Sequence, residues 1–174
     1  MIENIYLDSV IKRFYFYKDL GDKTLAQLTA EELHWQPDGE PNSIYLIIKH
    51  LSGNMLSRWT DFLTTDGEKP SRNRDSEFEE DAASKEKILD TWEKGWKCMM
   101  DTLSSLQPGD LEKTVNIRNE PHIVIDAINR QLAHVPHHIG QIVYIGKMIK
   151  KENWQNLSIP KGHSQDFNRQ KFGK

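Results

Sequence analysis

Apolar side chains recur every three or four positions in four stretches of the chain, a spacing that places them on one face of an α-helix. Polar or charged segments with glycine and proline separate these stretches. The predicted helices cover approximately residues 2–28, 42–63, 84–106 and 121–150. Four long helices joined by loops predict an all-α fold, a four-helix bundle.

The segments between and after these helices are expected to be irregular. Residues 65–81 are charged and have no apolar face, so they predict a long loop of the kind that often has a function. Residues 111–119 suit a short extended piece. Pro121 suits the first turn of the last helix. Residues 151–174 are expected to form an extended tail packed on the body of a single domain that spans residues 1–174.

Composition narrows the class of protein. The net charge is −3, so no basic field favours nucleic acid as a partner. No apolar run approaches the roughly 18 residues that span a bilayer, and the N-terminal residues lack the layout of a signal peptide. Cys98 is the single cysteine, which favours a reducing compartment. We therefore expect a cytoplasmic protein that acts on a small molecule, without membrane or nucleic-acid partners.

The last predicted helix carries polar residues in the middle of its apolar stripe. On this stripe His134 and His138 stand four positions apart, so both imidazoles can reach one ion. Buried polar groups without partners cost about 1–3 kcal/mol each, so something must satisfy them. The alternative is that they are surface or hydrogen-bonded core histidines. The stripe consists of Val124, Ala127, Gln131, His134, His138, Gln141, Ile145 and Met148.

His50 adds a third imidazole from the second predicted helix, at the border of its apolar face. Alone it would be read as a satisfied core histidine, but the pair on another helix makes a metal site the better interpretation. Gly53 lies one turn further on and leaves room for a ligand or an approaching helix. Three protein ligands leave a coordination position open, as in catalytic sites, for water or a thiolate. Imidazole suits zinc, nickel, copper and iron, and we expect zinc or nickel.

Several neighbours of these histidines are candidates for supporting roles. Gln141 is a candidate for orienting a ligand or binding substrate, or for a contact between helices. Arg58 lies two turns beyond His50 and is a candidate for binding substrate. His137 is turned away from His138 and is expected at the rim of the site. Pro136 is expected to bend the helix axis. No residue is assigned as catalytic.

The run His134-Val-Pro-His137-His138-Ile-Gly140-Gln141, with a lone histidine on an earlier helix, resembles the DinB/YfiT-like superfamily of four-helix bundles. By motif match, the resemblance implies His50, His134 and His138 as metal ligands. Pro136 departs from the motif, in which a helix-compatible residue is expected at this position. A closer resemblance, to an uncharacterised bacterial branch of this superfamily, rests on residues 56–70, 74–78 and 157–162.

Three functions are considered, of which the resemblance implies the first two. Some relatives transfer low-molecular-weight thiols such as bacillithiol to electrophiles, and others have been proposed as metal-dependent hydrolases. The third possibility is a non-catalytic metal-binding module in a stress response. A thiol S-transferase is our first expectation, with the thiol as co-substrate, and related bundles suggest a homodimer. Its basic pocket would draw on Arg58, Arg72 and Arg74; the alternative for these arginines is surface ion pairing with the acids Asp75, Glu77 and Glu79.

Overall fold

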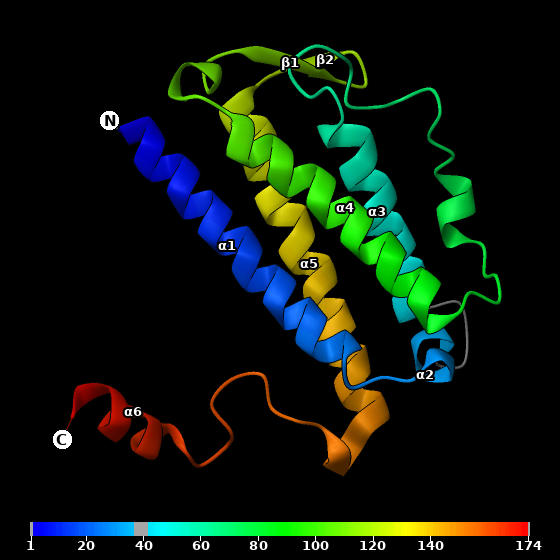
Figure 1. Cartoon of the computed structure of the whole chain (residues 1–174), viewed down its shortest axis with the longest axis vertical. Coiled ribbons are helices and arrows are strands. Elements are labelled where there is room, and N and C mark those ends of the chain that lie inside the picture. The colour runs from blue at the N-terminus through cyan, green and yellow to red at the C-terminus, as the bar shows by residue number, and fades with distance from the viewer. Residues whose placement is uncertain (1, 37–41, 174) are drawn as a thin grey trace.

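The computed structural model describes residues 2–36 and 42–173. Four long helices lie side by side (Figure 1), and the prediction of an all-α fold is confirmed. They are α1 (Ile2–Leu25), α3 (Ile44–Trp59), α4 (Lys85–Ser105) and α5 (Val124–Lys150). Helix α3 packs against α4 and α5, and α1 packs against the same two helices from the other side. The core therefore lies between four helices, each with two neighbours.

The helix boundaries follow from local capping chemistry. Ser43 accepts a hydrogen bond from the backbone N–H of Leu46 and begins α3, and Ser84 does the same for Lys87 at the start of α4. Most of α3 is buried, which makes it the central helix of the site described below. At Gly95 of α4, an added Cβ would stand 2.7 Å from the Cα of Ser52, so the absence of a side chain lets α3 and α4 approach closely.

The connections contain short elements that the hydrophobic pattern does not reveal. They are α2 (Ala30–His34), η1 (Asp75–Phe78), η2 (Pro108–Asp110), β1 (Thr114–Ile117), β2 (Glu120–Ile123) and η3 (Lys151–Asn153). Strands β1 and β2 form an antiparallel hairpin in which Thr114 pairs with Ile123. Its turn residues Arg118 and Asn119 both have positive φ. Pro121 therefore lies in β2, and the prediction that it starts the last helix is wrong.

The C-terminal segment differs from the predicted extended tail. Its beginning contacts the body, since Gln27 and Gln155 exchange hydrogen bonds and Trp154 lies against Gly146. Beyond this point the chain is exposed except for the half-buried Leu157, and it forms helix α6 (Ser164–Phe172), which stands away from the four long helices in Figure 1. In the described part of the chain, none of the helices combines the length and the apolar character needed to cross a membrane.

Candidate metal centre

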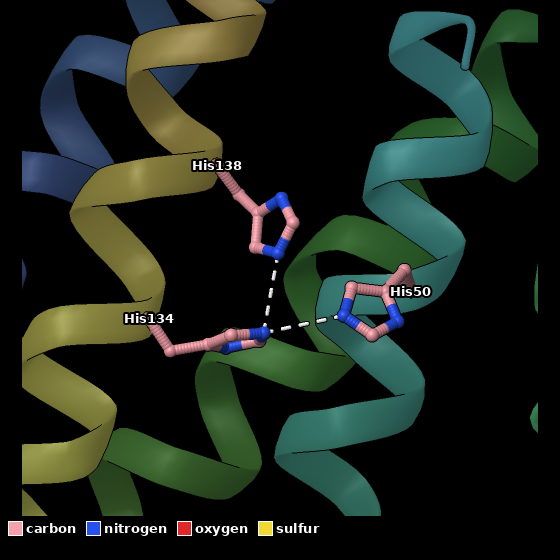
Figure 2. Close-up of side chains that lie close together, drawn as sticks. All are labelled: His50, His134 and His138. Atoms are coloured by element: carbon pink, nitrogen blue, oxygen red, sulfur yellow. Dashed lines mark hydrogen bonds between the residues drawn. The ribbon is translucent and has the colours of Figure 1, made fainter. Parts of the chain in front are cut away.

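Three histidines from two helices meet between α3 and α5. His50 projects from α3, and His134 and His138 project from successive turns of α5 (Figure 2). The Nε2 atom of His134 lies 3.2 Å from the Nε2 atom of His50 and 3.2 Å from that of His138. One ring nitrogen from each histidine lies within 4.8 Å of the other two. These three residues can hold a metal ion.

The spacing of these nitrogen atoms matches a metal site. Zinc–imidazole bonds of 2.0–2.1 Å at tetrahedral angles separate the ligand nitrogens by about 3.3–3.4 Å, and octahedral angles bring them to about 3.0 Å. The two separations of 3.2 Å fall between these values. Two of the three separations therefore suit a shared ion, and the third pair of ring nitrogens lies within 4.8 Å.

The hydrogen bonds on the far side of two rings set their tautomers. Nδ1 of His50 lies 3.0 Å from Oε2 of Glu77, and Nδ1 of His138 lies 2.7 Å from Oε1 of Gln141. Both acceptors are oxygens, so each Nδ1 carries the proton and donates it. In the neutral form of each ring, Nε2 then carries the lone pair and is the nitrogen available to a metal ion. One proton on His134 can satisfy only one of these lone pairs, whereas a cation would satisfy all three rings.

Glu77 forms a buried support behind His50. Its carboxylate accepts hydrogen bonds from Arg72 at 2.7 Å (Nε to Oε1) and 3.0 Å (Nη2 to Oε2). Burial opposes the charged form, but the hydrogen bonds from His50 and Arg72 outweigh it and lower the pKa of Glu77. A carboxylate that accepts the Nδ1–H of a metal-binding histidine fixes the ring and raises its basicity. Phe78, in the same 3-10 helix, stacks on the His50 ring at 5.3 Å between centroids.

The other two rings are held neutral. Burial, followed by the neighbouring His138 and His50, lowers the pKa of His134 to about 3. Burial also lowers the pKa of His138, against the opposing effect of its hydrogen bond to Gln141. Metal ions bind neutral imidazole, so the environment favours the form that a ligand requires.

Gly53 makes room for Glu77. A Cβ at this position would collide with the Oε1 atom of Glu77 and stand 2.8 Å from its Cδ. We predict that Gly53→Ala displaces the Glu77 carboxylate from His50 and lowers Zn²⁺ affinity about 10- to 100-fold, the usual effect of losing such a support. Stability should change little, because alanine favours the helix by about 1 kcal/mol. Competition with a chromophoric chelator measures the affinity.

Gly140→Ala is the matched control. Gly140 is an exposed glycine of α5, and an added Cβ meets nothing within 4 Å. Its Zn²⁺ affinity should equal that of the wild type. Equal affinity in Gly53→Ala and the wild type would show that Glu77 does not support His50.

The metal-free protein should lose stability in mild acid because of His134. In the unfolded chain histidine titrates near its ordinary value of about 6.5, whereas the folded-state pKa is about 3. The unfolded state then binds a proton that the folded state does not, so stability is full above pH 6.5 and falls as the pH drops towards 3. A single such group gives about 2 kcal/mol between pH 7 and 5, which we halve to about 1 kcal/mol because the ring is only half-buried.

Urea unfolding of the metal-free protein at pH 7 and 5 tests this pH dependence. His134→Leu removes the titrating ring, so the variant should lose about 1 kcal/mol less than the wild type between the two pH values. The same loss in both proteins would contradict a depressed pKa at His134.

A pocket of about 420 Å³ lies beside the three histidines and includes His134 in its lining. Arg58 and His137 also line it, which places both sequence candidates next to the proposed ion. His137 is exposed, as expected for a rim residue. Arg72 is not a free cation, because it forms a salt bridge with Glu77. The predicted alternative of an ion pair is therefore correct for Arg72, but the pair is buried and does not lie at the surface. Arg74 lies over the Phe78 ring instead, 5.5 Å from its centroid.

Two further sequence candidates take definite places. Gln141 contacts His138, so it is in position to orient a ligand, while its role in binding substrate stays a prediction. Helix α5 runs through Pro136 without interruption. Glu77 and Phe78 escaped the sequence analysis as site residues, since they lie in a segment without periodicity. The only indication in the sequence was Gly53, whose missing side chain leaves room for a neighbouring group.

The fold and the site define an all-α protein with a three-histidine centre that can hold a metal ion. The chain belongs to a family described as proteins of unknown function (DUF1572), whose profile matches residues 1–163. No curated protein and no solved structure shows a significant match to the chain.

Proposed function

We propose that the protein is a metal-dependent thiol S-transferase that acts on electrophilic small molecules, and that it belongs to the DinB/YfiT-like superfamily. The observation that carries the proposal is the convergence of three imidazoles beside an open pocket. In the described part of the chain this ligand group contains no carboxylate. Three neutral ligands leave the ion its full positive charge and an open position for an anionic sulfur atom.

The expected chemistry is nucleophilic substitution by a thiolate. A zinc or nickel ion in this site would lower the pKa of a thiol and keep it as thiolate near neutral pH. His137, at the exposed rim of the pocket, is placed to accept the thiol proton. The sulfur forms a bond to the electrophilic carbon, and the leaving group departs with the electron pair of the broken bond. Glu77 and Gln141 hold two of the three ligand rings in place throughout.

Superfamily membership has separate support. Four long helices, with one ligand on α3 and two on α5, reproduce the arrangement that the histidine motif implies. Pro136 is the departure from that motif, yet the helix continues through it and His134 and His138 stay on one side.

Hydrolysis receives less support from the same site. A metal-dependent hydrolase needs a general acid or base near the attacking water. In the described part of the chain the pocket beside His134 has no acid in its lining, which leaves His137 as the candidate general acid or base there. Glu77 is the carboxylate nearest the ligands, and His50 and Arg72 already occupy it.

Incubation with bacillithiol and iodoacetamide tests the proposal, with metal-free, Zn²⁺-loaded and Ni²⁺-loaded protein compared side by side. Each transfer forms one carbon–sulfur bond and releases one iodide, so thioether and iodide should appear in equal amounts. The expected result is turnover by a loaded form above the metal-free background, with no turnover by His134→Leu at the same metal concentration.

A panel of amides and esters distinguishes the alternatives. Rates with bacillithiol that never exceed the metal-free background would overturn the S-transferase proposal. Ester hydrolysis in its place would favour the hydrolase, and inertness towards both substrate types would favour a non-catalytic metal-binding module.

A further inference from the structure

Buried polar atoms without partners gather around one pocket. In the described part of the chain, six buried side-chain nitrogen or oxygen atoms lack a hydrogen-bond partner. Two are indole nitrogens of Trp59 and Trp96. The other four belong to residues that line the pocket beside the metal centre: Asn54 Oδ1, Arg58 Nε, Gln131 Nε2 and His134 Nδ1. Because each such atom costs about 1–3 kcal/mol, this concentration points to a ligand that satisfies them.

Arg58 is the strongest of these observations. Its side chain extends from α3, only 9% of the residue is exposed, and no ion pair holds its guanidinium within the described residues. The charged groups around it are mostly cations, and Arg130 and Arg72 act on it more strongly than Glu68 does. Burial and these cations lower the pKa of Arg58. A buried cation among other cations is unfavourable unless an anion joins it.

A second guanidinium stands at the edge of the same pocket. Arg130 is exposed and donates a hydrogen bond from Nη1 to Nε2 of His122 at 3.1 Å. His122 in turn donates from Nδ1 to Asp126 at 2.7 Å. This chain of contacts holds Arg130 in place and leaves its other donors available. The described lining of the pocket therefore has two guanidiniums and two amides, and no acid to neutralise them.

We propose that this pocket binds the carboxylate of a small organic acid next to the metal centre. The fork of Arg58 and the amide N–H of Gln131 donate to the two carboxylate oxygens, and Arg130 adds charge at the rim. The free oxygen of Asn54 accepts from an N–H or O–H group of the same molecule. His134 lines the pocket too, so the ligand lies beside the ion. The inference rests on the proposed function only in treating this acid as substrate or co-substrate.

N-Acetylalanine is the probe, since it carries a carboxylate and an N–H donor but no sulfur. Its binding to Zn²⁺-loaded wild type, measured by calorimetry, should be about ten- to hundred-fold tighter than that of its methyl ester, the factor typical of hydrogen bonds to charged groups. Arg58→Leu should lose the same factor for the acid and leave the ester unaffected. Inorganic phosphate is the competing anion and should bind more weakly.

A melting curve of Arg58→Leu separates binding from structure. Replacement of a buried unpaired cation by an apolar side chain should leave the melting temperature equal or raised. If the variant fails to fold, Gln131→Leu serves instead, with a smaller expected loss. Equal binding of acid and ester, tighter binding of phosphate, or unchanged acid binding in a folded Arg58→Leu would each overturn the proposal. Because the probe has no thiol, its binding can be observed even if the protein transfers no thiol. Likewise, thiol transfer can be observed even if the probe does not bind.

Discussion

His134→Leu is expected to lower Zn²⁺ affinity by at least about 100-fold without destabilising the metal-free protein. The loss should exceed the 10- to 100-fold effect typical of supporting residues, because His134 would itself be a ligand of the ion. Its Nε2 is the atom that lies 3.2 Å from both other histidines, so its removal takes away the shared nitrogen and leaves only two candidate ligands. The Nδ1 of His134 is buried without a partner, so an apolar replacement of similar size removes a penalty of about 1–3 kcal/mol.

Two measurements on the same variant separate these effects. Chelator competition gives the Zn²⁺ affinity, and urea unfolding in the absence of metal gives the stability. His137→Leu is the matched control, since it removes an adjacent histidine that lies outside the ligand group. It should bind Zn²⁺ like the wild type. Wild-type affinity in His134→Leu would contradict the site, and a large loss of metal-free stability would assign His134 a structural role instead.

Metal loading is expected to raise the melting temperature by about 5–10 °C when free Zn²⁺ is about 100 times its dissociation constant. Binding to the folded state alone stabilises it by about 2.7 kcal/mol at that ratio. A chain of 174 residues responds with about 2–4 °C per kcal/mol. An ion held by His50 and His134 would link α3 to α5, which are not consecutive along the chain because α4 lies between them.

Chelation provides the control for this prediction. Excess EDTA should return the melting temperature to the metal-free value, and His134→Leu should show no shift at the same Zn²⁺ concentration. Equal melting temperatures for metal-free and loaded wild type, at concentrations that fill the site, would show that no ion bridges the two helices.

The sequence predicted the long helices well because each buries a continuous apolar face. The boundary of α5 was placed too early, since Pro121 suits a first helical turn as well as an edge strand. Pro121 lies in a strand because β2 pairs with β1. The spacing of apolar residues along a helix carries no information about such pairing between strands. Helix α6 escaped prediction for another reason: its residues are exposed, so no apolar face marks it.

The candidate site was predictable where it follows helical spacing. His134 and His138 come together because residues four positions apart share one side of a helix. His50 could be added only because the pair His134 and His138 lies on another core-facing helix; alone it would be interpreted as a satisfied core histidine. Glu77 could not be found this way, since the path of the loop that delivers it depends on packing against α3.

Anomalous X-ray diffraction from Zn²⁺-loaded crystals, recorded at the zinc absorption edge, tests the central claim most directly. We predict one anomalous peak about 2.0–2.1 Å from the Nε2 atoms of His50, His134 and His138 alike. A zinc ion bound by fewer than three of these residues, or three rings without a common peak in crystals that hold zinc elsewhere, would contradict it.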